Sequence, residues 1–88
     1  MLHLTLRQIE YVVAVARAGS LSAAAATLNV SQPSLSVALS HVEATLGERL
    51  FMRSKGAPLR VTMFAHQFVA EAEALLAMAR RLEDPGRI

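Results

Sequence analysis

Apolar residues recur at helical spacing near the start of the chain, directly after Thr5. Thr5 and Gln8 form a T-x-x-Q pattern, in which each side chain can bond the other residue's backbone N–H at a helix start. Gly19 follows the periodic stretch and suits the left-handed residue that ends many helices. Several valines would also suit a buried strand, but the spacing and both end signals predict a helix. Its apolar positions are Leu6, Ile9, Val12, Val13, Val15 and Ala16.

A second, shorter helix is predicted in the alanine-rich segment that follows. Ser20 or Ser22 can act as its N-cap, and the helix would continue through AAAATL to Leu28. Asn29 then tolerates the left-handed conformation that ends a helix. Alanine is the best helix former, and its small side chain also allows close packing against a neighbouring helix.

A third helix is predicted from its N-cap Ser31 to Leu46, with Pro33 in the first turn and Gly47 at the end. Its apolar stripe consists of Leu35, Ala38, Leu39, Val42 and Leu46. The opposite face consists of Gln32, Ser36 and Ser40, flanked by Pro33, Val37 and Glu43. This face is short-chained and nearly uncharged, whereas an ordinary solvated face, the alternative, more often carries Glu and Lys. The pattern favours a helix-turn-helix whose second helix lies in the major groove of DNA.

Two short alternating segments, Leu50–Arg53 and Leu59–Thr62, flank a turn that contains Gly and Pro. They predict a β-hairpin, which would form a wing directly after the helix-turn-helix. The densest basic cluster of the chain falls here, and it would attract DNA phosphates unless it is simply a solvated loop. The cluster consists of Arg49, Arg53, Lys55 and Arg60.

A long last helix is predicted from the cap Thr62 to about Glu83. Its apolar residues are spaced alternately four and three apart, as in a coiled-coil seam: Val61, Ala65, Phe68, Ala72, Leu75, Ala79 and Leu82. A second flank consists of Phe64, Val69 and Leu76. We expect this flank to pack on the domain and the seam to meet a second subunit. In the alternative, both flanks pack within the monomer.

Composition narrows the function classes. Hydrophobic residues make up 53% of the 88 residues, a high share for a domain of this size, which favours a partner subunit. The net charge is only +2 and there is no cysteine. The three histidines lie on separate predicted elements, and no P-loop or nucleophile elbow occurs, so we expect neither an enzyme nor a bound metal or cofactor. Without a signal peptide or membrane span, a cytoplasmic protein is expected.

The chain resembles the DNA-binding domain of LysR-type transcriptional regulators over about residues 4 to 82. The motifs that carry the resemblance are LRQI, the GS before the second helix, VSQPSLS and LGERLFMR. The resemblance implies a mainly α protein: a winged helix-turn-helix over residues 1–62, a linker helix that pairs subunits over 63–84 and a tail over 85–88. It also implies an effector-binding domain that is absent from this sequence, through which alone a small-molecule effector would act.

The resemblance also implies roles for individual residues in a homodimer that binds a partly palindromic, T/A-containing duplex. Helix 31–46 would read bases in the major groove, and wing 50–62 would enter the minor groove. Base contacts would come from Gln32, Pro33, Ser36, Val37 and Arg53. Phosphate contacts would come from Ser22, Ser31 and Ser54, with Lys55 and Arg60 from the basic cluster. The subunit interface would comprise Phe68, Ala72, Leu75, Ala79 and Leu82.

One departure from the family pattern concerns base readout. Many members carry Arg where this chain has Val37, and valine can contact a thymine methyl group but cannot donate a hydrogen bond to guanine. We therefore expect less G·C readout by this helix and more dependence on Arg53. The remaining alternatives are a winged-helix regulator of another type, such as MarR-like, and a helical protein-interaction module that does not bind DNA.

Overall fold

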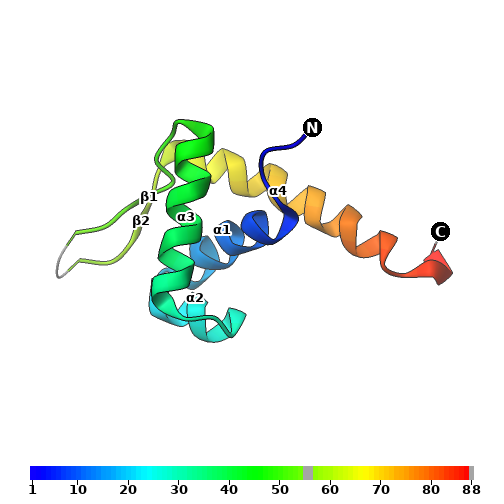
Figure 1. The fold of residues 1–88 in the computed structure, drawn as a ribbon, viewed down its shortest axis with the longest axis horizontal. Coiled ribbons are helices and arrows are strands. Elements are labelled where there is room, and N and C mark those ends of the chain that lie inside the picture. The colour runs from blue at the N-terminus through cyan, green and yellow to red at the C-terminus, as the bar shows by residue number, and fades with distance from the viewer. Residues whose placement is uncertain (55–56, 88) are drawn as a thin grey trace.

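The computed structural model describes residues 1–54 and 57–87, and its order of elements confirms the predicted fold class. The helices are α1 (Leu6–Ala18), α2 (Leu21–Leu28), α3 (Gln32–Leu46) and α4 (Met63–Leu82), and the hairpin strands are β1 (Phe51–Met52) and β2 (Arg60–Val61). A 3₁₀ turn follows at Pro85–Arg87. The hairpin projects from one side of the helical body and α4 extends beyond the other, so the molecule measures 47 × 27 × 19 Å (Figure 1).

Hydroxyl side chains begin all four helices, as predicted. Thr5 and Gln8 make both bonds of the capping box, at 3.1 and 2.9 Å. Three further caps each accept a backbone N–H at 3.1 Å: Ser20 from Ala23, Ser31 from Ser34 and Thr62 from Ala65. These bonds satisfy N–H groups that the helix itself leaves unpaired.

Left-handed residues end the first three helices. Gly19 (φ 73°), Asn29 (φ 58°) and Gly47 (φ 69°) each stand at the predicted C-terminus. Such a residue reverses the chain within a few residues, which brings each helix back onto the previous one. Local sequence signals thus account for the boundaries of α1, α2 and α3.

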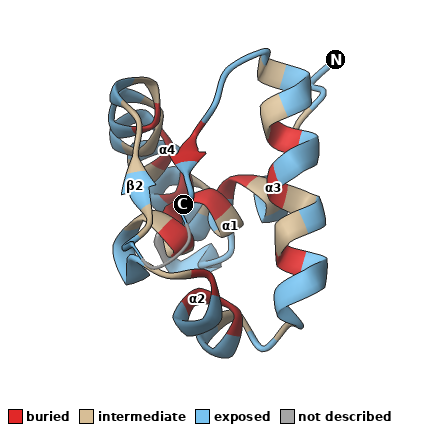
Figure 2. Ribbon diagram, turned by 90° about the vertical axis from the view of Figure 1, so that its left-hand side faces the viewer, coloured by how far each residue is buried: buried red, intermediate tan, exposed pale blue. Residues whose placement is uncertain are grey.

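The main core lies where α1, α2, α3 and the hairpin meet. Its largest fully buried side chains are Val12, Val15, Leu35, Val42 and Leu50. The buried residues of α3, which are Leu35, Leu39 and Val42, lie on one side of the helix, and its other side is exposed (Figure 2). The predicted apolar stripe of α3 therefore faces inward, which turns the small polar face to solvent.

The hairpin is shorter than predicted. The pairs are Phe51 with Val61 and Met52 with Arg60, in antiparallel register. Phe51 is buried in the core, whereas Met52 and Arg60 are exposed. Leu50 and Thr62, at the predicted ends, retain a backbone bond of 3.0 Å but use their other groups for contacts with the helices.

The packing of α4 differs from the predicted division between seam and flank. Ala65 and Ala72 of the seam are 0% and 5% exposed, and Leu76 of the flank is 4% exposed. Ala72 and Leu76 share a buried cluster with Ile9 and Val13 of α1. Both sets thus pack on the domain along the first part of α4, because α1 lies against them. Within the described residues, no helix is long and apolar enough to cross a membrane.

Candidate nucleic-acid interface

The exposed face of α3 carries the side chains expected to read DNA bases. Gln32, Pro33 and Val37 are exposed, with Val37 60% accessible, and Ser36 is half-buried. A shallow hollow lies farther along this face, lined by Ser36, Val37, Ser40, His41 and Ala44. None of the residues along it from Gln32 to His41 is acidic, so the face offers amide, hydroxyl and apolar groups to an approaching surface.

The wing returns one basic side chain to this face. Arg53 follows β1, and its Nη1 donates a hydrogen bond of 3.3 Å to Oγ of Ser36 on α3. The two residues are seventeen positions apart in sequence. The fold thus brings together two residues that the sequence placed on separate elements.

A second hollow joins the start of α2, the start of α3 and the wing. It contains four of the predicted contact residues, Ser22, Gln32, Arg53 and Ser54, and the rest of its lining is Gly19, Ser20, Leu21, Ala57, Pro58 and Leu59. The start of α2 adds the partial positive charge of a helix N-terminus. Hydroxyl groups, an arginine and a helix start suit an anion such as a DNA phosphate.

The hydroxyl of Ser31 is engaged within the protein. Ser31 Oγ accepts the backbone N–H of Ser34 at 3.1 Å and donates to Ser34 Oγ at 2.8 Å. The two hydroxyls therefore retain one free proton between them. Ser34, which the sequence analysis did not single out, shares this hydrogen bond, and its place three residues after the cap was the available signal.

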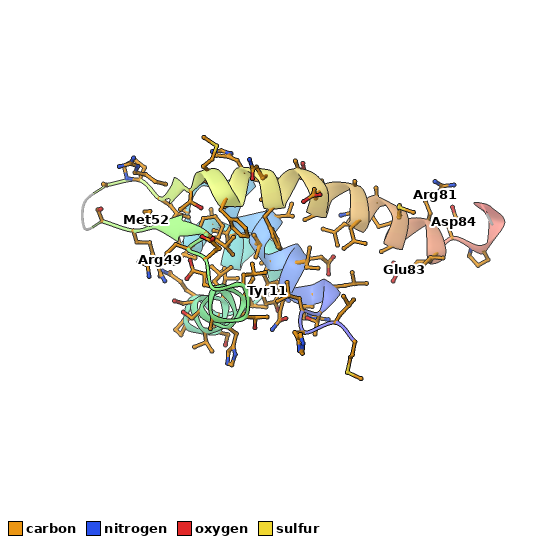
Figure 3. All side chains as sticks on the ribbon, turned by 90° about the horizontal axis from the view of Figure 1, so that it is seen from above. Tyr11, Arg49, Met52, Arg81, Glu83 and Asp84 are labelled. Atoms are coloured by element: carbon orange, nitrogen blue, oxygen red, sulfur yellow. The ribbon has the colours of Figure 1, made fainter. Side chains whose placement is uncertain are left out.

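Arg49, Lys55 and Arg60 complete the basic cluster predicted from the sequence. Arg49 and Arg60 are exposed, whereas Lys55 lies outside the described residues. In Figure 3, Met52 lies on the hairpin, Arg49 lies between the hairpin and α3, and Arg81, Glu83 and Asp84 lie at the far end of α4. Arg53 thus brings positive charge onto α3, whereas Arg81 lies far from that helix.

Two residues tie the base of the wing to the helices, and sequence reasoning missed both roles. Glu43 of α3 accepts backbone N–H groups of Leu50 and Phe51, and Thr62 donates its hydroxyl to the carbonyl of Arg49 at 2.7 Å. Their spacings in sequence match no local motif. The bonds form only because the chain reverses after Gly47 and again in the hairpin.

The residues expected at a subunit interface separate into two groups. Phe68 and Ala72 pack against the domain's own core. Leu75 is 44% exposed, Leu82 is 73% exposed and Ala79 is half-buried, and Met78, which was not predicted, is 64% exposed. The last part of α4 thus keeps exposed apolar side chains, and they include Met78.

No group of three potential metal ligands occurs among residues 1–54 and 57–87. The most prominent charged contact there joins Arg17 of α1 to Glu73 of α4, with the Arg17 Nε donating at 2.9 Å. This pair is exposed to solvent. It contributes at most about 1 kcal/mol to stability, as surface ion pairs do.

Residues 6–66 match the family model described as bacterial regulatory helix-turn-helix protein, lysR family. Over 81 residues the chain is 40% identical to the HTH-type transcriptional regulator TcbR of Pseudomonas sp. (strain P51), which covers 92% of this chain and 27% of TcbR. The chain spans from about a quarter to a third of the length of the three first curated relatives, 27%, 23% and 33%.

Solved structures of similar shape include a complex with DNA. The CbnR DNA-binding domain in its DNA complex has a TM-score of 0.86 and 38% identity, covering 96% of this chain and 95% of that one. Full-length OxyR C199D from Pseudomonas aeruginosa has a TM-score of 0.89 and 34% identity, covering 97% of this chain and 28% of that one.

Proposed function

Because this chain belongs to the lysR family of bacterial regulatory helix-turn-helix proteins, we propose that it binds double-stranded DNA sequence-specifically as part of a transcriptional regulator. One observation carries the proposal. The exposed face of α3 and the wing residue Arg53 form one continuous surface through the bond between Arg53 and Ser36. The CbnR domain, alike in shape over nearly all of both chains, was solved in a complex with DNA.

In this proposal α3 enters the major groove. Gln32 bonds an adenine edge, with its amide oxygen accepting from N6 and its amide nitrogen donating to N7. Pro33 and Val37 contact thymine methyl groups, and Ser36 bonds a base or holds Arg53. Arg53 enters the neighbouring minor groove, where a narrow A·T tract has enhanced negative potential. Phosphate contacts come from Ser22, Ser31, Ser54 and Arg60, with Lys55 assigned from its place in the sequence.

The protein binds a partly palindromic site as a homodimer. The dimer would use the exposed apolar surface at the end of α4, formed by Leu75, Met78, Ala79 and Leu82. Phe68 and Ala72 support this part of the helix from the domain side. A two-fold axis at this surface would present two copies of α3 to two half-sites.

Titration with duplex DNA over a range of salt concentrations tests the proposal. A site is first selected from random duplexes, and a scrambled duplex of equal length is the control. We expect tighter binding to the selected site, with log K falling linearly as log salt rises, because phosphate contacts release counterions. Equal affinity for both duplexes would contradict sequence-specific binding. No binding at low salt would contradict DNA binding altogether.

A further inference from the structure

Glu43 lies on α3, yet its side chain reaches the base of the wing. One carboxylate oxygen, Oε2, accepts the backbone N–H of Leu50 at 2.7 Å and that of Phe51 at 3.3 Å. Leu50 is 0% exposed and Phe51 is 5% exposed, and Glu43 itself is half-buried. The carboxylate thus supplies an acceptor to two amides of a segment whose side chains are buried in the core.

Thr62 holds the same segment from the side of α4. Its backbone N–H donates to the carbonyl of Leu50 at 3.0 Å, and its hydroxyl donates to the carbonyl of Arg49 at 2.7 Å. The same hydroxyl oxygen accepts the N–H of Ala65 at 3.1 Å and so begins α4. Residues 49–51 are therefore bonded to α3 through Glu43 and to the start of α4 through Thr62.

The position of Arg53 depends on this anchor. Only Met52 lies between Phe51 and Arg53, and the hairpin beyond its two paired positions projects from the body (Figure 1). Arg53 contacts α3 through a single long bond to Ser36, and both groups are accessible to solvent. That bond alone cannot orient the wing, because exposed side-chain bonds contribute little net free energy.

We propose that Glu43 is a positioning residue that sets the placement of the wing relative to α3, with Thr62 as its counterpart. The proposal rests on the proposed function, in which α3 and Arg53 occupy adjacent grooves of one duplex. Two elements can enter two grooves together only if the offset between them matches the duplex. The carboxylate does not touch DNA in this role; it acts through the wing and Arg53.

Two substitutions at Glu43 distinguish its role as a hydrogen-bond acceptor from the effect of its negative charge. Glu43→Gln removes the charge but keeps an oxygen at the same distance from the backbone, so it should keep the hydrogen bonds to the N–H groups of Leu50 and Phe51. Glu43→Asp keeps the charge but shortens the side chain by one methylene, which withdraws the acceptor from Leu50 and Phe51. Glu48→Asp is the matched control, because Glu48 is an exposed acid just after Gly47. All variants are compared well below their thermal midpoints, so that loss of stability does not reduce the folded fraction.

The decisive measurement is the effect of Arg53→Ala in each background, on the selected duplex. In the otherwise unchanged chain we expect Arg53→Ala to weaken binding about tenfold, as removal of a base-reading arginine does. With Glu43→Asp the same change should cost about twofold or less, whereas with Glu43→Gln or Glu48→Asp it should again cost about tenfold. An equal cost of Arg53→Ala in all backgrounds would overturn the proposal, because a purely stabilising role would leave that cost unchanged. If Arg53→Ala costs less affinity in the Glu43→Gln background as well as in Glu43→Asp, the positioning role does not depend on the acceptor oxygen of Glu43.

A measurement on the free protein tests the positioning role of Glu43 independently of DNA binding. Residual dipolar couplings report the orientation of β1 and β2 amides relative to those of α3. Glu43→Asp should change this orientation and speed amide hydrogen exchange at Leu50 and Phe51, and Glu43→Gln should preserve both. Unchanged couplings and exchange in Glu43→Asp would overturn the positioning role even if the chain binds DNA. Failure of the unchanged chain to bind any duplex would instead overturn the proposed function.

Discussion

Gln32 and Val37 lie on the same exposed face of α3 but offer different chemistry to a DNA groove. The amide of Gln32 presents a donor and an acceptor, which match the N7 and N6 groups of adenine. Val37, 60% exposed, presents only methyl groups. Neither residue contributes to the core, so substitutions at both positions test recognition without loss of the fold.

Gln32→Ala should weaken binding to the selected site by about 1–3 kcal/mol, because a bidentate contact to one base is lost. Binding to a scrambled duplex should hardly change. Gln67→Ala, which removes an exposed glutamine from α4, is the control and should leave both affinities unaltered. Fluorescence anisotropy titrations on both duplexes measure the effect. If the two duplexes lose affinity equally, Gln32 does not read a base.

Val37→Ala should remove a contact with a thymine methyl group. The test replaces thymine by uracil at each position of the selected site in turn, which deletes that methyl group alone. At one position the unchanged protein should lose about 0.8 kcal/mol, the value of one buried methyl-sized group. Val37→Ala should lose much less there, because its partner for the methyl group is already gone. An undiminished loss in Val37→Ala would assign the methyl contact to another residue.

At the scale of elements, the turns after the helices decide how the helices meet. Gly47 ends α3 at φ 69° and sends the chain toward Glu43 and the wing. A Cβ placed at Gly47 would meet no atom within 4 Å. Any cost of a side chain there would therefore come from the backbone conformation and not from a steric clash.

Gly47→Ala should destabilise the domain by about 1 kcal/mol, because L-residues disfavour the left-handed region. For a domain of this size that corresponds to a fall of about 4–8 °C in the thermal midpoint. Gly86→Ala is the control, since Gly86 does not have a positive φ. Thermal unfolding followed by circular dichroism at matched protein concentration checks both variants. An equal midpoint for Gly47→Ala and the unchanged chain would show that the turn adapts without cost.

At the scale of the whole molecule, α4 packs one side on the domain and leaves apolar residues exposed on another side toward its C-terminal end. Ala72 and Leu76 pack on α1, while Leu75, Met78 and Leu82 remain exposed. These exposed residues are spaced three and four apart, so they form one side of the helix. A second copy of the chain would cover this surface in the homodimer proposed above.

Leu75→Glu should raise the dimer dissociation constant at least about a hundredfold, because it would bury an unpaired charge on both copies. Ala70→Glu, an equally charged change at an exposed position on another side of α4, should leave the dimer intact. Sedimentation velocity over a range of concentrations distinguishes monomer from dimer. Persistence of the Leu75→Glu dimer would place the interface elsewhere on the molecule.

The boundaries of the helices could be predicted from sequence because they depend on neighbouring residues. Thr5, Ser20, Ser31 and Thr62 cap the helices through bonds that span three residues, and Gly47 ends α3 by its own φ. The inward side of α3 was equally predictable, since helical periodicity places Leu35 and its neighbours on one side. The outward face of the candidate site followed from the same periodicity.

What only the tertiary structure decided is which neighbour each surface meets. Periodicity gives the angle of Ala72 on α4, but the position of α1 decides that Ala72 packs within the domain and that Leu75 stays exposed. The contacts of Arg53 with Ser36 and of Glu43 with Leu50 likewise join residues on different elements. Capping and amphipathicity are properties of a short stretch of chain, whereas these contacts depend on how all the elements pack together. The sequence by itself therefore determined the elements and their exposed chemistry, and the packing determined how the wing is held beside α3.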